Sequence, residues 1–500
     1  MANEYLYGAF GHIGETVAQT AVQAGTVPVY VGTAPVNLVR EYRDKDLVNA
    51  PVQLYNFPDA QKKMGYTAHG RWPAFTLCEA FAAHFDNTVG NIGPIYVFNV
   101  LDPDIHRKAV ATTKSLAFQN GRAEFKSDTI ILDTFLLAEK MEGVDFTLDY
   151  SYVKSTAIVS SVDPDAPLTG TIEATFYEVD TDAVTHEDII GGVTAGGQYS
   201  GFGAIRLLYT ECFQVANLIA APGWSHIPAI YNALISAGRK INGHWDAFSP
   251  ADIPLVDSGG QKVDTIEKAK AWRRANGYQS ERTKVYWPLG IDNNGRIFHL
   301  STMAMVELMR ADFSHKSVPM ETCGNTQIPI IRQYFGEGST NRGFDEEQAK
   351  ELTSQGISTA ISRGGKWVLW GDHTAAYTYG DEMVDPRAIF DVSMRMLMHI
   401  TNSFQREWGP TIDDPMTFQI KDRIINREQE KLDALVTMGA LLGSPRVLFL
   451  ETANPKTDLM NGDFRWDIPV TPTPPLKSAS VYVAYTDTGF SAYYNDEEVA

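Results

Sequence analysis

Hydrophobic positions along this chain recur with two periods, and segments of one period alternate with segments of the other. The apolar runs at 27–32 and 94–100 have the length and β-branched content of buried strands. Between them, aromatic residues recur at helical spacing over 72–85, where Pro73 suits the first turn of a helix. Further strand and helix signals follow at 216–223, 227–237, 265–276 and 283–288. This alternation predicts an α/β domain with a parallel or mixed sheet, made of residues 27–102 and 201–327.

Between the two halves of this domain, the pattern changes to alternating strands separated by turn residues. The candidate strands lie at 114–118, 120–125, 129–133, 146–152 and 171–179. The dipeptide Asn120-Gly121 is typical of a tight β-hairpin turn. We therefore expect a β-rich surface insertion over residues 103–200 that interrupts the α/β domain.

The last third of the chain ends in long amphipathic helices. A helix is expected over 345–354 and a buried strand over 365–371, followed by helices over about 385–408 and 414–442. Charges at 427–431 fit the solvated face of the second long helix or, alternatively, a docking surface for a partner filament. We expect a C-terminal core domain over residues 328–475, which makes the whole chain a multidomain α/β protein of mixed α+β character.

Both ends of the chain have the pattern of β-strand arms that lack a local partner. The first arm, residues 1–26, is an aromatic and glycine-rich stretch, and the second, residues 476–500, follows the proline-rich spacer 469–475. Because an unpaired strand edge is normally covered or blunted, two such arms predict strand addition between copies of the chain. The residues expected to contact other copies are Tyr5, Tyr7, Phe10 and Ile13 in the first arm and Val481, Tyr482 and Val483 in the second.

Composition and charge disfavour several classes of binding partner for this chain. The formal net charge of −19 disfavours direct binding to nucleic acid or to an anionic membrane, because phosphate contact needs a basic patch. The three cysteines, Cys78, Cys212 and Cys323, have no metal-ligand spacing and fit buried positions in a reducing compartment. A secretory leader and a membrane-spanning run are not evident in the sequence. We expect assembly in cytoplasm.

A search for catalytic motifs leaves one alternative open. Gly8, Gly11 and Gly14, followed by a helix-compatible stretch and a strand, imitate the turn that seats a dinucleotide pyrophosphate. The acidic residue expected on the ribose is missing after the strand, so a glycine-containing arm is the preferred interpretation and an NAD-type enzyme is the alternative. Phosphate-loop, zinc-protease, EF-hand and nucleophile-elbow motifs are not found. We expect a protein that is not an enzyme and that binds no cofactor or metal.

A series of ordered landmarks resembles the contractile tail sheath proteins of bacteriophages and related injection machines. The landmarks are 28–35, 188–192, 217–225, 271–273, 286–288, 356–359 and 368–374. None of these segments is a catalytic signature, and their order along the chain carries the resemblance.

The resemblance implies a structural subunit that polymerises as stacked hexameric rings, or a multi-start helix, around an inner tail tube. Contraction would drive the tube through the target cell envelope without a nucleotide. The implied partners are other copies of the chain, the inner tail tube protein, and baseplate and tail terminator proteins, all in a virion tail assembled in the host cytoplasm. In this family the arms add strands to a C-terminal sheet of adjacent copies. Carried onto this chain, the acceptor strand would comprise Trp367, Val368, Leu369 and Trp370.

Overall fold

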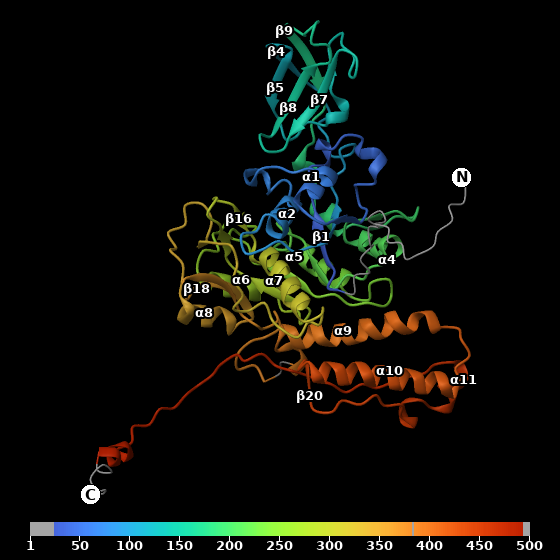
Figure 1. Cartoon of the computed structure of the whole chain (residues 1–500), viewed down its shortest axis with the longest axis vertical. Coiled ribbons are helices and arrows are strands. Elements are labelled where there is room, and N and C mark those ends of the chain that lie inside the picture. Colours follow the sequence, from blue (N-terminus) through green and yellow to red (C-terminus); the bar gives the residue numbers. More distant parts are fainter. Residues whose placement is uncertain (1–24, 383–384, 494–500) are drawn as a thin grey trace, which may run out of the picture.

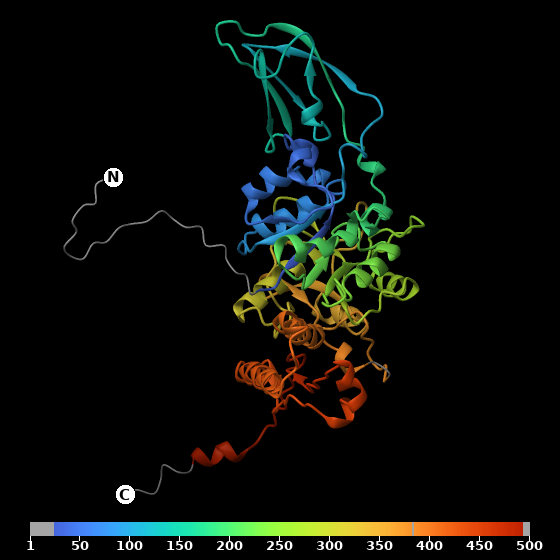
Figure 2. The same ribbon diagram turned by 90° about the vertical axis from the view of Figure 1, so that its right-hand side faces the viewer.

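The computed structural model describes residues 25–382 and 385–493. Three parts follow one another along its long axis: a β-sandwich at one end, an α/β body in the middle and a pair of long helices at the other end (Figure 1). A C-terminal segment runs away from the helices and the body in both ribbon views (Figure 2). The fold is multidomain with mixed helices and strands, which confirms the expected fold class.

The first sheet of the body has the strand order β12-β1-β3-β2. Its strands are β1 (Pro28–Gly32), β2 (Val52–Leu54), β3 (Ile95–Asn99) and β12 (Leu218–Ala220). β12, β1 and β3 run parallel and β2 antiparallel. β1 and β3 are buried at every position, as predicted for the runs at 27–32 and 94–100. Helix α1 (Phe57–Met64) packs beside β2, and α2 (Leu77–Phe85) packs on β1.

Helix α2 begins later than the pattern over 72–85 predicted. The hydroxyl of Thr33 donates to the carbonyl of Ala74 and accepts from the N–H of Thr76, and the N–H of Leu77 donates to the carbonyl of Thr33. The backbone between Ala74 and Leu77 is thus tied to the loop after β1. These bonds replace the helical ones, so the helix starts at Leu77.

The second sheet has the order β13-β14-β18-β19, and β13 lies next to β12 of the first sheet. Its strands are β13 (Ser249–Asp252), β14 (Thr283–Tyr286), β18 (Ile357–Arg363) and β19 (Lys366–Trp370). The helices that share its core are α5 (Pro228–Ala237), α6 (Ile266–Ala275) and α8 (Glu346–Thr353). The sheet joins strands from both sides of residue 328, and the domain limits drawn from the sequence remain predictions.

Helix α7 (Leu300–Ser314) is the central helix of the body, because it contacts β12, β13 and β14 as well as α2. It is buried on nearly all sides, and even Thr302 and Glu307 are buried. Because its buried residues lie on nearly all sides and include polar ones, α7 shows no clear amphipathic period, and the hydrophobic pattern did not predict it.

The sandwich consists of two three-stranded sheets with the orders β4-β9-β6 and β5-β8-β7. Its strands are β4 (Thr112–Phe118), β5 (Arg122–Lys126), β6 (Leu136–Leu137), β7 (Phe146–Ser151), β8 (Thr156–Ser161) and β9 (Gly170–Phe176). Its core is separate from the body core and draws on residues 116–176 together with Leu38. The following residues Val184 and Ile189 pack in the body core instead.

Two expectations for the sandwich are corrected. The turn at Asn120-Gly121 has positive φ at both residues, but β4 and β5 pair only at Gln119 and Arg122 and then enter different sheets. Residues 129–133 form a single β-bridge, between Ile130 and Glu178, and then enter the 3₁₀ helix Leu132–Thr134 instead of continuing as a strand. The Asn37 amide donates to the carbonyls of Asp128 and Ile130, which ties the start of that segment to the body.

The C-terminal part is a pair of helices, α9 (Asp391–Trp408) and α10 (Phe418–Thr437), which are shorter than the helices predicted over 385–408 and 414–442. A two-stranded ribbon of β20 (Leu441–Leu442) and β21 (Thr471–Pro472) packs beside them, with the short helix α11 (Lys456–Asn461) between its strands in the sequence. The remaining elements are α3 (His186–Ile190), α4 (Leu207–Cys212), β10 (Gly192–Val193), β11 (Tyr199–Ser200), β15 (Leu289–Ile291), β16 (Ile297–Phe298) and β17 (Arg332–Tyr334).

Candidate assembly surfaces

Two buried ion pairs fix the start of α9 to the body. Lys284 Nζ lies 2.6 Å from Asp391 Oδ2, and both side chains are fully buried. Burial alone would lower the pKa of Lys284, but the charge of Asp391 outweighs it and raises this pKa above its usual value. One turn further on, Arg395 pairs with buried Asp312 of α7. Because removing one partner of a buried pair costs about 3–5 kcal/mol, these contacts hold the helix pair at a set angle to the body.

The C-terminal segment leaves the ribbon at a defined place. The N–H of Thr473 donates to the carbonyl of Ala440, and four residues later Lys477 Nζ lies 5.4 Å from the centre of the Tyr377 ring. This ring is stacked on His373 at a centroid distance of 3.6 Å. Lys477 therefore anchors the segment to the second sheet's side of the molecule before it turns outward.

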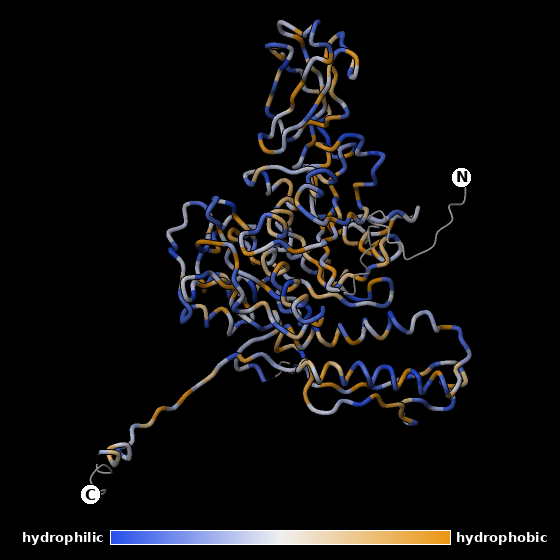
Figure 3. The backbone as a smooth tube through the Cα atoms, in the orientation of Figure 1, coloured by the Kyte–Doolittle hydropathy of each residue, from blue (hydrophilic) through white to orange (hydrophobic). Residues whose placement is uncertain are grey.

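Beyond Lys477, residues 478–485 are exposed along the chain. Residues 480–485 form no strand here, and Val481, Tyr482, Val483 and Tyr485 are 84%, 95%, 89% and 85% exposed. Figure 3 shows hydrophobic stretches along this extended segment. The alternating pattern predicted a strand, and a strand needs a partner that the described part of a single chain does not supply.

The first arm cannot be placed in the same way. Tyr5, Tyr7, Phe10 and Ile13, and the glycines Gly8, Gly11 and Gly14 of the dinucleotide alternative, lie outside the described residues.

The acceptor prediction for Trp367 to Trp370 does not fit the single-chain structure. These residues form β19 at the end of the second sheet, paired on one side with β18. Its other side is occupied as well: Asn325 donates to Leu369 O, Leu369 donates to Thr326 O, and Ile328 donates to Trp367 O. A strand from another copy could pair with β19 only if segment 325–328 left it.

The ribbon beside α9 has the free edge that β19 lacks. Asp467 exchanges both backbone hydrogen bonds with Leu448, and β21 pairs with β20. Backbone groups of successive strand residues point to opposite edges. The backbone N–H and C=O groups of Ile468 and Val470 therefore point to the outer edge of the ribbon. Within the described residues, these groups form no hydrogen bond. We call the strand of residues 466–472 the edge strand.

An apolar groove runs between the edge strand and α9. Its volume is about 280 Å³, and it is lined by Leu397, Ile400, Thr401, Phe404, Gln405, Trp466, Ile468 and Val470. Sequence reasoning did not find this groove, although the period-two spacing of Trp466, Ile468 and Val470 was a signal for it.

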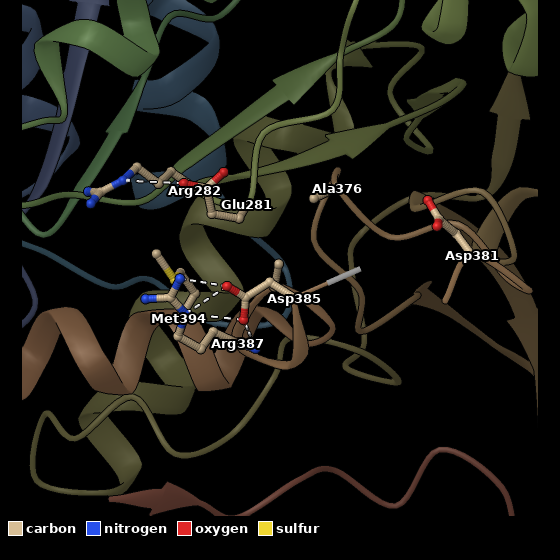
Figure 4. Close-up of a pocket in the computed structure, with 8 residues that line it drawn as sticks. Glu281, Arg282, Ala376, Asp381, Asp385, Arg387 and Met394 are labelled. Carbon is tan, nitrogen blue, oxygen red and sulfur yellow. Dashed lines mark hydrogen bonds and ion pairs between the residues drawn. The ribbon is translucent and has the colours of Figure 1, made fainter. Parts of the chain in front are cut away.

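A charged pocket of about 360 Å³ lies beside the N-terminal end of α9 (Figure 4). Arg387 and Asp385 lie side by side in it and form an ion pair (Figure 4), while Arg282 pairs with Asp246. A guanidinium held by its own carboxylate is not available to a ligand anion, so the pocket is stabilised by internal pairs.

Titratable groups inside the body are engaged in structural contacts. His299 at the start of α7 lies 2.8 Å from Glu79 of α2; burial would lower the His299 pKa, but Glu79 raises it to about 9. His84 bonds Tyr30 and the carbonyl of Ile92, and burial lowers its pKa to about 4. A grouping of three or more histidine, cysteine or carboxylate side chains fit for a metal ion is absent from the described part of the chain. Within residues 25–382 and 385–493, no helix combines the length and hydropathy needed to cross a bilayer.

Comparison with solved structures identifies the class of fold. The helical sheath of the anti-feeding prophage in its contracted state has a similar fold, with a TM-score of 0.53 and 13% sequence identity over 96% of this chain and 100% of that chain. The architecture described above, from the body to the helix pair with its ribbon, thus has a fold similar to that of this contracted sheath.

Sequence relatives lead to the same class. The tail sheath protein of Burkholderia phage BcepMu is 26% identical over 504 residues, which cover 95% of this chain and 96% of that protein. The major tail sheath protein of Serratia phage KSP20 is 24% identical over 310 residues, covering 61% of this chain and 72% of that protein. No protein-family model matches the chain. The chain is therefore similar, over nearly its whole length, to contractile tail sheath proteins.

Proposed function

We propose that this chain is the repeating subunit of a contractile tail sheath and that copies join through strand addition. The observation that carries the proposal is that one chain holds both halves of such a contact. Residues 480–485 are an exposed strand-forming segment, and the ribbon offers the edge strand 466–472. The similarity to tail sheath proteins over nearly the whole chain supports the same role, and it gives the NAD-type alternative no support.

The arms give the assembly its direction. When the segment of one copy pairs with the ribbon of the next, the contact is heterologous, so it repeats from copy to copy instead of closing a dimer. Six copies per ring, stacked around an inner tail tube and capped by baseplate and tail terminator proteins, form the proposed sheath of a virion tail. The arm residues Tyr5, Tyr7, Phe10 and Ile13 add the second connection between copies. The subunit itself performs no catalysis in this role.

The proposed contraction depends on which parts of the subunit are rigid and which part can bend. The pairs Lys284–Asp391 and Arg395–Asp312 fix α9 to the body, so the subunit moves as one unit. The short exposed stretch between Lys477 and the strand-forming residues serves as the connection that bends. Subunits then slide and rotate against one another while their strands stay paired, as in other switches based on interfaces.

Truncation tests the proposal directly. The full chain, a chain ending at Pro475 and a chain lacking residues 1–15 are purified and compared by negative-stain electron microscopy at equal, high concentration. We expect hollow, striated tubes from the full chain, and soluble monomers with unchanged far-UV circular dichroism from each truncated chain. Small closed particles from all three chains would reject the sheath role. Tubes from both truncated chains would reject strand addition.

A further inference from the structure

We propose that the apolar groove beside α9 receives one particular face of the C-terminal segment of another copy, the face formed by Val481, Val483 and Tyr485. This inference rests on the proposed sheath function and specifies which side chains make the contact. It assigns a role to the groove and an orientation to the strand.

A strand added at the free edge of the edge strand would direct half of its side chains into the groove. Trp466, Ile468 and Val470 alternate along the edge strand and therefore share the face turned towards α9. A strand added at the free edge lies about 4.8 Å further out, and half of its side chains point to the same face. Those side chains would lie over Leu397 and Ile400 of α9, which line the far wall of the groove.

The C-terminal segment has two unequal faces. Val481, Val483 and Tyr485 alternate on one face, and Ser480, Tyr482 and Ala484 on the other. The first face buries more apolar surface in a groove whose lining is mainly apolar. Tyr485 stands at the end of this face, where its hydroxyl can stay at the wet rim while its ring packs. The second face, with Tyr482, then points to the outside of the ribbon.

The occupant comes from a second copy rather than from the same chain. Lys477 holds the segment against Tyr377, and the segment runs away from the helix pair in both ribbon views (Figures 1 and 2). Pro474 and Pro475 keep the preceding chain extended, which opposes a turn back to the edge strand. Within one chain, the C-terminal segment therefore runs away from the groove that it fits, and the segment of a second copy fills the groove.

Matched substitutions on the two faces test the orientation. Val483→Asp places a charge in the apolar groove and is expected to raise the protein concentration needed for polymerisation about tenfold or more. Tyr482→Asp, one residue away on the outer face, is expected to change it by about twofold at most. Ile400→Asp, on the groove wall, is expected to reproduce the effect of Val483→Asp. The reverse ranking of the two segment variants would overturn the assignment of the faces.

Photo-crosslinking identifies the occupant. Benzoylphenylalanine replaces either Tyr485 or Tyr482, and light and ¹⁵N-labelled chains are mixed before assembly and irradiation. We expect the probe at 485, but not at 482, to crosslink to 397–405 or 466–470 of a chain with the other label. Crosslinks within one label only would show that the chain's own segment fills the groove. Groove crosslinks from 482 alone, or tubes without groove crosslinks, would also overturn the inference while leaving the sheath role intact. If the unmodified chain forms no tubes at all, the proposed function fails first.

Discussion

At the scale of single residues, the ion pair between Glu79 and His299 joins the two layers of the body. Glu79 lies in α2 on the first sheet, and its carboxylate accepts from both the backbone N–H and the Nδ1 of His299. Since His299 precedes α7, the pair connects the first sheet to the central helix. The positive charge of the imidazolium is stabilised by this carboxylate in a buried place.

This pair predicts a pH dependence of stability. The pKa of His299 is raised to about 9, above its ordinary 6.5, so its contribution is fully present below pH 6.5 and is lost as the pH rises through 9. We expect the melting temperature of the full chain to fall over this window. Glu79→Gln removes the charge that raises the pKa and should abolish that part of the fall, as thermal unfolding followed by circular dichroism would show. Glu187→Gln, beside the exposed His186, is the matched control and should leave the profile unchanged; an identical profile for Glu79→Gln would contradict the prediction.

Residue patterns in the sequence predict a C-terminal strand, and its acceptor is harder to derive from such patterns. Val481, Tyr482 and Val483 alternate within a proline-bounded segment, and that local pattern requires no knowledge of the fold. The acceptor depends on which strand edge is free. Trp367 to Trp370 look like an open edge strand until residues 325–328 cover them, and that pairing joins segments about 40 residues apart. Edge occupancy is a property of the whole sheet, so it could not be derived from the strand alone.

At the scale of elements, prediction succeeded where the local pattern and the burial agree. β1 and β3 are short apolar runs buried on both faces, and α9 carries an apolar stripe that packs on its neighbours. Prediction failed at α7, which is buried on nearly all sides, and at 129–133, where a single bridge to Glu178 is followed by a 3₁₀ helix. In both failures, contacts with distant segments decide the structure.

The sandwich is an element that can be removed as a unit. Arg107 and Val179 pair with each other where the chain enters and leaves it, so a Gly-Ser link in place of residues 108–178 can join them. Because the sandwich has its own core, we expect the shortened chain still to form tubes, narrower than those of the full chain, in electron micrographs. Leu38 belongs to the sandwich core, so the shortened chain also carries Leu38→Ser, which removes an apolar side chain that the deletion would expose. A folded shortened chain that forms no tubes would show that the sandwich joins copies rather than decorating the outside.

At the scale of the whole molecule, the arrangement of donor and acceptor decides how the polymer grows. The C-terminal segment runs away from the helix pair (Figures 1 and 2), so in the proposed assembly each copy donates to one neighbour and accepts from a different one. A chain that ends at Pro475 keeps its groove and edge strand but has nothing to donate. Such a chain can occupy a site at a growing end without offering the next connection.

Mixing the two chains therefore predicts shorter tubes in proportion to the truncated fraction. We expect a minor fraction of the chain ending at Pro475, added to the full chain before assembly, to reduce the mean tube length measured in micrographs, because each incorporated copy interrupts a row of strand pairs. The same chain carrying Ile400→Asp has a disturbed groove, is incorporated less often and should shorten the tubes less. If both mixtures give tubes as long as those of the full chain alone, growth does not depend on the C-terminal segment, and the first arm must carry the connection by itself.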